Sequence, residues 1–227
     1  MKSNGELILE KIRRKNNWKE DRIFYQVDDS IKLQCLYPTK SYYYYELKNN
    51  NYIHHLNITA PKLLFAAPSA YIGSTGCSHI YAIIREHQPN LIIESGIGRG
   101  ATSTFILTAL QKNGKGKLIS IDKDADAGPL VFNGLKLNWD KRIGKTSDIL
   151  PTIDTSIDIF LHDSLHTYEN MSFEFEWAYQ HMTSGGLIMS HDIGTNNSLY
   201  DFAIKHGLKV QYLQTTKNRY GIGVIVK

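Results

Sequence analysis

After about residue 78 the chain alternates short apolar runs with segments of helical periodicity, and this alternation limits the possible folds more than any other feature. Five segments predict strands: 91–93, 118–121, 142–145, 157–161 and 187–190. Most of these segments are continuously apolar, which is typical of strands buried on both faces of a sheet. Four segments before, between and after them predict helices: 78–88, 102–112, 168–182 and 198–206. Strands that alternate with helices predict a parallel sheet covered on both faces.

The C-terminal end of the chain departs from this alternation. Segments 209–214 and 221–226 predict two more strands, and the turn between them, 215–219, is too short for a crossover helix. We therefore expect the last two strands to form an antiparallel hairpin. The predicted fold is α/β: a Rossmann-like, doubly wound, mostly parallel seven-stranded sheet with an antiparallel C-terminal hairpin and an N-terminal extension.

The first 70 residues lack long periodic stretches. Segment 5–14 has the spacing of a short helix, and segment 31–36 has the character of a strand. We expect residues 1–70 to form an extension that acts as a lid or binds a substrate, and residues 71–227 to form the main domain. The glycines of segment 71–77 suit a lid, whereas the tyrosine run at 42–45 suits half-buried packing or contact with a substrate.

Composition excludes several classes of protein. The formal net charge is only +4, and lysine and arginine are scattered, so we expect no nucleic-acid partner. No apolar run approaches the length of a membrane span, and residues 1–10 lack the apolar region of a secretory signal. Cys35 and Cys77 do not form a CxxC pair, which predicts free thiols. These features together predict a cytoplasmic protein without membrane contact.

Acidic residues end the predicted parallel strands or follow them closely. They are Glu94, Asp122, Asp148, Asp163 and Asp192. In a parallel α/β sheet, ligands bind outside the carboxyl ends of the strands. A sheet that served only a structural purpose would not need an acid at each of these positions. Acids at these positions would instead serve to bind a metal ion, or a ligand that carries ribose hydroxyls, an amine or a sulfonium.

A glycine-rich turn follows the first of these strands. Gly96, Gly98 and Gly100 permit positive φ angles and a close backbone approach. The turn lacks the G-x-G-x-x-G spacing of dinucleotide-binding proteins, and Glu94 before it would repel a pyrophosphate. These features favour a ligand of the S-adenosylmethionine type. Asp122 is the candidate acceptor for ribose hydroxyls, although it could also be a helix N-cap or share this role with Asp124.

Residues 78–227 resemble class I S-adenosylmethionine-dependent methyltransferases, in particular the branch of catechol O-methyltransferase and metal-dependent sugar O-methyltransferases. The resemblance rests on the glycine turn, the acid after the second strand, Gly185-Gly186 and the closing segment 221–226. It implies cofactor contacts from Glu94, Gly96, Gly98, Gly100, Thr102, Asp122, Ser147 and Asp148. The turn and Thr102 would hold the methionine end, Asp122 the ribose, and Ser147 and Asp148 the adenine.

Two Asp–His pairs after neighbouring strands are the candidate reaction centre. Asp163, His191 and Asp192 are the predicted metal ligands, and carboxylates suit Mg²⁺ whereas an added imidazole also suits Mn²⁺ or Fe²⁺. His166 is the predicted general base and Asp163 its catalytic partner. In the resembling enzymes a divalent ion here binds the acceptor oxygen. The catechol pattern has Asp-Asn where this chain has His191-Asp192, and a lysine base where it has His166.

These departures leave some roles open. His191 could bind the ion or only orient one of its ligands. A metal-free site in which Asp163 orients His166 is an alternative. In a third alternative, Asp163 and Asp192 only cap helices. The predicted reaction is methyl transfer to a small-molecule acceptor, a sugar or phenolic hydroxyl. The alternatives are an NAD-dependent oxidoreductase, a non-catalytic binding module, and methylation of nitrogen or carbon. The resemblance also allows a homo-oligomer.

Overall fold

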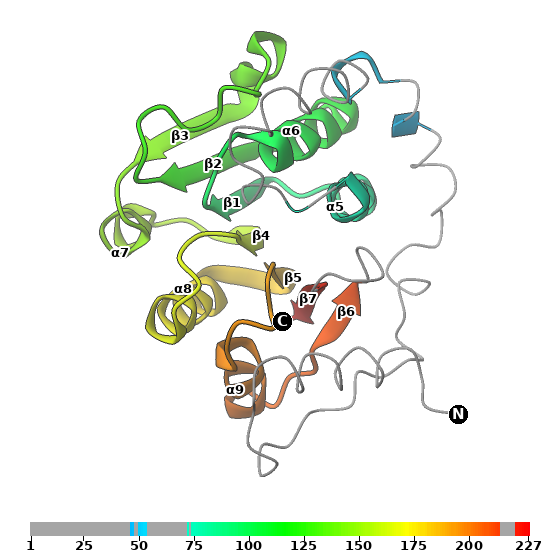
Figure 1. Cartoon of the computed structure of the whole chain (residues 1–227). Helices are drawn as coiled ribbons and strands as arrows, with labels where there is room; N and C mark the ends of the chain where they lie inside the picture. The colour runs from blue at the N-terminus through cyan, green and yellow to red at the C-terminus, as the bar shows by residue number, and fades with distance from the viewer. Residues whose placement is uncertain (1–45, 48–49, 54–71, 73, 214–220) are drawn as a thin grey trace.

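The computed structural model describes residues 46–47, 50–53, 72, 74–213 and 221–227 (Figure 1). In these ranges a seven-stranded sheet runs through the centre of the domain in the order β3-β2-β1-β4-β5-β7-β6. The strands are β1 (Leu91–Ser95), β2 (Lys117–Asp122), β3 (Trp139–Ile143), β4 (Ile157–His162), β5 (Met182–Ser190), β6 (Gln211–Leu213) and β7 (Ile222–Val226). Strands β1 to β5 are parallel, and β7 runs antiparallel to both β5 and β6. The predicted mostly parallel α/β sheet with an antiparallel C-terminal pair is therefore confirmed.

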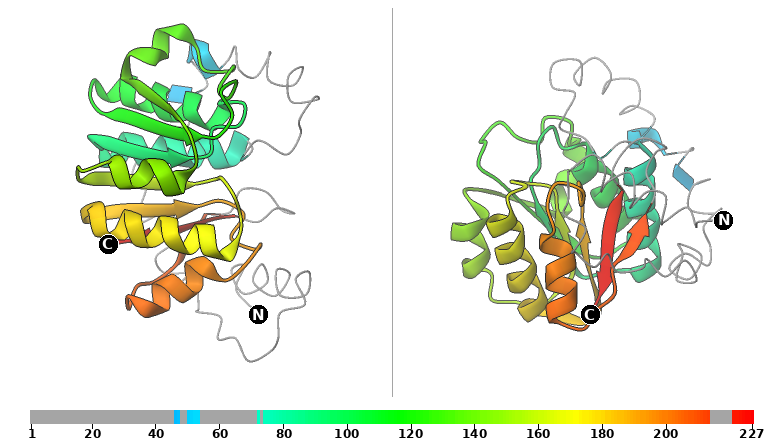
Figure 2. Two further views of the ribbon diagram at one scale, coloured as in Figure 1. Left: turned by 90° about the vertical axis from the view of Figure 1, so that its left-hand side faces the viewer. Right: turned by 60° about the horizontal axis from the view of Figure 1, so that its bottom comes forward.

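Helices cover both faces of this sheet (Figure 2). One face carries α5 (Ser74–His87) and α6 (Ala101–Asn113), and the other carries α7 (Thr146–Ile149), α8 (Tyr168–His181) and α9 (Ser198–Lys205). Neighbouring strand residues point to opposite faces, so Ile92 packs with the α5 and α6 core whereas Ile93 packs with the α8 and α9 core. The continuously apolar strand sequences follow from this double burial.

Three predicted boundaries are wrong. The first helix begins at Ser74, four residues before the predicted start at 78. The fifth strand begins at Met182 instead of 187, because the exposed Ser184 and Gly185 interrupt the apolar run that marks the strand. The third strand is Trp139–Ile143 instead of 142–145, and the preceding polar segment forms the 3₁₀ helix Asn133–Asn138. Strand β3 lies at the edge of the sheet and is only partly buried, so it has no apolar run to mark it. Trp139 determines its position by donating an indole hydrogen bond to the Ser120 hydroxyl at 2.9 Å.

Short pieces of the N-terminal region pack on the α5 and α6 side of the sheet. Leu47 and Ile53 are buried in that core, and the Tyr52 ring contacts Phe132. The division at residue 70 stays a prediction. The expected helix 5–14, strand 31–36, tyrosine run 42–45, Cys35, the turn 215–219 and parts of the segment 71–77 lie outside the described residues.

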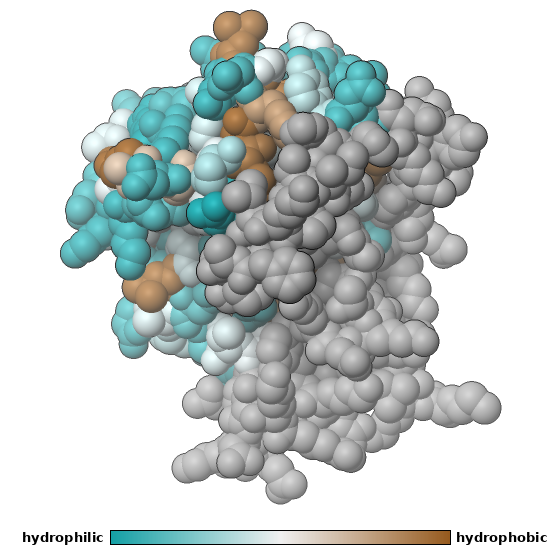
Figure 3. Space-filling view, turned by 45° about the horizontal axis from the view of Figure 1, so that its top comes forward, coloured by the Kyte–Doolittle hydropathy of each residue, from teal (hydrophilic) through white to brown (hydrophobic). Residues whose placement is uncertain are grey.

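The surface of the described part is largely hydrophilic. Its large exposed apolar side chains belong to several different elements: Leu137, Ile143, Leu165, Tyr168, Phe173 and Ile204. On the face shown in Figure 3, apolar residues form separate patches among hydrophilic ones. Among the described helices, none is long and apolar enough to cross a bilayer.

Candidate functional site

The loops that follow β1, β2 and β4 are joined by backbone hydrogen bonds at the carboxyl edge of the sheet. The Asp163 amide donates to the Ser95 carbonyl at 2.8 Å, and the Gly96 amide donates to the Ile121 carbonyl at 2.8 Å. The order of the strands places β1 between β2 and β4, so the glycine turn lies between the loops that carry Asp122 and Asp163. This position is the reversal of strand order at which α/β sheets bind ligands.

The glycines of the turn permit close contact between protein loops. Gly96 has a φ of +90°, and a Cβ atom there would lie 2.2 Å from the Asp163 carbonyl oxygen. Gly100 has a φ of +83°, and its Cβ would lie 2.8 Å from the Gly128 Cα. Both positions therefore exclude larger residues even without a ligand. Gly98 also has a positive φ, and it is exposed to solvent.

Glu94 is buried under the turn with one carboxylate oxygen still available. Its Oε2 accepts hydrogen bonds from the hydroxyls of Ser103 at 2.7 Å and Ser120 at 2.6 Å. The other oxygen, Oε1, is buried without a hydrogen-bond partner. Burial raises the pKa of Glu94 to about 8, against the lowering effect of the two serines. An acid in this state suits a ligand that brings a positive charge or a hydrogen-bond donor.

The Asp122 carboxylate holds the glycine turn in place. Its Oδ2 accepts from the backbone amides of Ile97 at 2.8 Å and Gly98 at 3.0 Å, and its Oδ1 accepts from the Asp124 amide at 3.0 Å. A carboxylate can accept about four hydrogen bonds, so capacity for a ligand hydroxyl remains. Asp124, the alternative ribose acceptor, is exposed and accepts from the Asp126 amide. The ribose role of Asp122 stays a prediction.

The other predicted cofactor residues occupy two separate places. Thr102 is buried on α6, where its hydroxyl lies 3.7 Å from Cys77 Sγ of α5, so this hydroxyl packs between helices. Ser147 and Asp148 lie exposed on α7, and the Ser147 hydroxyl donates to Asp148 Oδ1 at 3.0 Å. Helix α7 follows β3 after two residues, and the adenine role of Ser147 and Asp148 stays a prediction.

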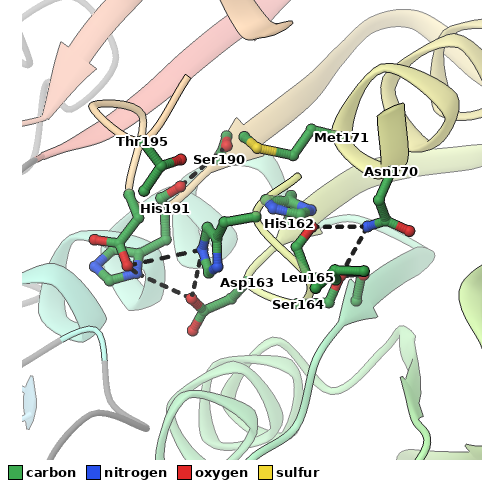
Figure 4. Close-up of polar contacts among 12 residues, drawn as sticks. His162, Asp163, Ser164, Leu165, Asn170, Met171, Ser190, His191 and Thr195 are labelled. Atoms are coloured by element: carbon green, nitrogen blue, oxygen red, sulfur yellow. Dashed lines mark hydrogen bonds and ion pairs between the residues drawn. The ribbon is translucent and has the colours of Figure 1, made fainter. Parts of the chain in front are cut away.

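The predicted reaction centre comes together beside the turn (Figure 4). His191 Nδ1 lies 2.9 Å from Asp163 Oδ1, and His166 Nε2 lies 3.9 Å from the same oxygen. Asp192 Oδ2 lies 3.7 Å from His166 Nε2 and 3.5 Å from His191 Nδ1. One ligand atom each from Asp163, His166 and His191 fits within 4.8 Å. This donor set fits a metal ion. It includes two of the three ligands predicted from sequence, Asp163 and His191, together with His166, the predicted base, and it does not include Asp192.

The electrostatics of this cluster favour an uncharged imidazole at His166. Burial lowers the pKa of His166, and the nearby His162 adds to the effect, whereas Asp163 and Asp192 oppose it. Asp192 has a positive φ of 50°, which is unusual for a residue other than glycine. Aspartate tolerates this conformation better than most residues, and here it places a carboxylate next to both imidazoles.

A buried network behind this cluster was missed by the sequence analysis. His162 Nδ1 lies 2.6 Å from Glu174 Oε2, and both side chains are fully buried. Glu174 Oε1 accepts from the Ser95 hydroxyl at 2.8 Å, the Ser164 hydroxyl at 3.0 Å and the Asn170 amide at 2.9 Å. The network joins β1, β4 and α8 beneath the site.

One signal in the sequence could have found this network. Glu174 falls at helical spacing on the same face as Met171, Phe175 and Ala178, all of which are buried. A carboxylate on an apolar helix face needs a buried partner. His162 at the end of β4 is that partner, and its ring also meets His166 edge-on at a centroid distance of 5.1 Å.

Comparisons with known proteins agree with this geometry. Residues 93–193 match a family model described as a methyltransferase domain. This segment begins in β1, ends after β5 and includes the glycine turn, Asp122 and the Asp–His cluster. A search of curated proteins found no match.

Several solved structures share the fold. The O-methyltransferase TomG from Streptomyces achromogenes, in complex with S-adenosylmethionine, has a TM-score of 0.63 at 16% identity, with 86% of this chain and 98% of that chain covered. The O-methyltransferase from Bacillus cereus, in complex with S-adenosylhomocysteine, has a TM-score of 0.64 at 16% identity, with 86% and 100% covered. The methyltransferase PaMTH1 from Podospora anserina, also bound to S-adenosylhomocysteine, has a TM-score of 0.61 at 11% identity, with 91% and 98% covered.

At such low identity these structures establish the fold alone, and the family model adds the domain type. The resemblance found in the sequence is thereby confirmed. Residues 93–193 match a family model of a methyltransferase domain, and the chain shares its fold with solved O-methyltransferases.

Proposed function

We propose that this protein transfers the methyl group of S-adenosylmethionine to a hydroxyl of a small molecule, with the help of a divalent ion. One observation carries the proposal: the glycine turn and the Asp–His cluster adjoin at one edge of the sheet. The Gly96 position leaves no room for a Cβ against the Asp163 backbone. A methyl donor held by the turn would therefore lie next to any acceptor held by the cluster.

The cofactor side rests on Glu94 and Asp122. When bound, S-adenosylmethionine supplies an electrophilic methyl group on a positively charged sulfonium. Glu94 offers a buried side-chain oxygen without a hydrogen-bond partner. Because burial raises its pKa, a cationic or hydrogen-bond-donating ligand would favour its charged form, whereas the pyrophosphate of a dinucleotide would oppose that form. The Asp122 carboxylate holds the turn and keeps lone pairs free for ribose hydroxyls. These features favour the methyl donor over NAD.

The acceptor side rests on Asp163, His166, His191 and Asp192. A divalent ion held there would lower the pKa of the acceptor hydroxyl. His166 Nε2 lies within 3.9 Å of both Asp163 and Asp192, so it can either take up the hydroxyl proton or bind the ion. Asp163 contributes to both arrangements, because its carboxylate contacts both imidazoles. Alignment of acceptor and methyl donor would provide most of the acceleration.

We infer the acceptor class from two exposed side chains on the segment that follows β4. Leu165 is 62% exposed and Tyr168 is 43% exposed, and both lie on the segment that carries Asp163 and His166. An apolar side chain and an aromatic ring suit the flat face of a phenol or the apolar face of a sugar. We propose acceptors of this size.

Calorimetric titration with S-adenosylhomocysteine, with and without a divalent ion, tests the proposal. We expect one-to-one binding, followed by methyl transfer in a screen of sugars and phenols. Absence of binding under both conditions would contradict a methyltransferase function. A parallel screen of amines as methyl acceptors distinguishes methylation of nitrogen from methylation of oxygen.

A further inference from the structure

We propose that Asp163, His166 and His191 bind a divalent transition ion, such as Mn²⁺, Fe²⁺ or Zn²⁺, in preference to Mg²⁺, with both imidazoles as ligands. The role of the ion in methyl transfer rests on the proposed function. Its binding does not, because a metal site can be measured without cofactor or acceptor.

The spacing of the donor atoms matches a coordination shell. In an octahedral coordination shell, metal–ligand bonds of about 2.1 Å place adjacent donor atoms about 3.0 Å apart and opposite donor atoms about 4.2 Å apart. His191 Nδ1 and Asp163 Oδ1, at 2.9 Å, have the separation of adjacent ligands. His166 Nε2, at 3.9 Å from Asp163 Oδ1, falls between the two limits. Small side-chain rotations would therefore place all three atoms around one ion.

The chemistry of the donors disfavours Mg²⁺. Magnesium prefers oxygen ligands and gives up its water molecules reluctantly, whereas imidazole nitrogen suits zinc, iron and other transition ions. Two of the three donors here are nitrogens. Two histidines with one carboxylate also leave coordination positions open for an acceptor oxygen. Asp192 Oδ2, within 3.7 Å of both imidazoles, can serve as a fourth ligand.

Hydrogen bonds fix the backbone at the two histidines that carry the imidazoles. The His191 amide donates to the His162 carbonyl at 2.9 Å, and the Asn196 amide side chain donates to the His166 carbonyl at 3.1 Å. His166 Nε2 is itself buried without a hydrogen-bond partner. A buried nitrogen that faces two carboxylates without a hydrogen bond needs a ligand, and an ion provides one.

This assignment changes the role of His166. A nitrogen that binds an ion has no lone pair left for the proton of the acceptor. His166 is then a metal ligand, and the hydroxyl loses its proton to solvent or to Asp192 once its oxygen is bound. His191 is likewise a ligand and does not merely orient one.

Metal binding to the chelator-treated protein tests the proposal. We expect Mn²⁺ or Zn²⁺ to bind at least about tenfold more tightly than Mg²⁺ in competition experiments. Pulsed electron paramagnetic resonance of the Mn²⁺-loaded protein should show coupling to two imidazole nitrogens. Equal affinity for Mg²⁺ and Mn²⁺, or a spectrum without nitrogen coupling, would overturn the proposal.

Substitution of each histidine identifies which imidazole gives which nitrogen coupling. His166→Gln and His191→Gln should each remove one nitrogen coupling and weaken Mn²⁺ binding at least about tenfold. The exposed His87 at the end of α5 provides a matched control, since His87→Gln should change neither. Retention of both nitrogen couplings in His166→Gln would contradict the role of His166 as a ligand. If a variant fails to fold, the spectrum of the wild-type protein still tests the proposal. Titration of the same samples with S-adenosylhomocysteine tests the methyltransferase function separately.

Discussion

Glu94 and Glu174 are both buried carboxylates, but their surroundings shift their pKa values in opposite directions. Burial dominates at Glu94 and raises its pKa to about 8, because two serine hydroxyls compensate only partly. Burial also acts on Glu174, but the hydrogen bond and charge of His162 outweigh it and lower the pKa. The pKa of a buried acid therefore depends on whether a hydrogen-bonding partner such as an imidazole lies beside it.

Replacement of Glu94 by glutamine should remove a pH dependence of stability. The folded protein holds the Glu94 proton up to about pH 8, whereas the unfolded chain releases it near the ordinary pKa of 4.5. The free energy of unfolding of the wild type should thus fall, relative to Glu94→Gln, as pH rises from about 5 to 8, by a few kcal/mol in total. Denaturant unfolding of both proteins over this range measures the difference. A constant difference across the range would contradict the pKa shift.

Replacement of Glu174 by glutamine should destabilise the protein strongly. The change leaves buried His162 without its carboxylate partner, and loss of one member of a buried pair costs about 3 kcal/mol or more. Glu176→Gln on the same helix is the matched control, because its bonds to Lys205 and His206 lie at the surface and contribute at most about 1 kcal/mol. Urea unfolding measures both. Equal effects of the two changes would rule out a structural role for the buried network.

At the scale of elements, the turn between β1 and α6 determines how the site is assembled. Its amides are held by Asp122 after β2, and its first glycine lies against the backbone after β4. Three strands that are far apart in the sequence are therefore fixed relative to one another by one short loop. A change in this loop should affect the proposed cofactor side and the proposed metal side together.

Gly96→Ala should disrupt the protein more than Gly114→Ala. Both glycines have positive φ, so each alanine adds a backbone strain of about 1 kcal/mol. A Cβ at Gly114 meets nothing within 4 Å, whereas one at Gly96 lies 2.2 Å from the Asp163 carbonyl oxygen. We expect an additional destabilisation of about 2 kcal/mol or more and weaker binding of S-adenosylhomocysteine in Gly96→Ala alone. Thermal unfolding measures the stability of the two variants, and calorimetry measures their affinity for S-adenosylhomocysteine. Equal stability and equal affinity would contradict the close packing of Gly96 against Asp163.

At the scale of the whole molecule, the sheet separates two apolar cores. The α5 and α6 side also takes up Leu47 and Ile53 from the N-terminal region, and Glu46 forms an ion pair with Arg85 of α5 at 3.0 Å. The candidate site lies at the carboxyl edge of the sheet, where the loops after β1, β2 and β4 meet, so a ligand there would contact several loops of the domain. Ligand binding should therefore stabilise the complete domain.

Bound S-adenosylhomocysteine should raise the melting temperature of the protein. A ligand at about 100 times its dissociation constant adds about 2.7 kcal/mol to the free energy of unfolding, which corresponds to about 5–10 °C for a domain of this size. Differential scanning calorimetry measures the shift, with NAD as the control ligand. Stabilisation by NAD in place of S-adenosylhomocysteine would favour the oxidoreductase alternative.

The sequence determined the α/β class, the antiparallel C-terminal pair and the resemblance to methyltransferases. Apolar periodicity reports burial, and burial on both faces already distinguishes strands such as β1 and β4 from helices. The same property explains why the boundaries of β3 and α5 were predicted wrongly. Half-exposed β3 has no apolar run, and the small residues at the start of α5 give no clear periodic signal.

Tertiary structure decided which side chains meet. Only the strand order, with β1 next to β4, brings the Gly96 turn against Asp163, and only the packing of α8 on β4 pairs Glu174 with His162. It also turned the Thr102 hydroxyl toward Cys77 and added His166 to the ligand atoms around Asp163. These contacts join residues distant in sequence or on different loops. Local patterns cannot encode them, because such contacts depend on how the complete sheet is assembled.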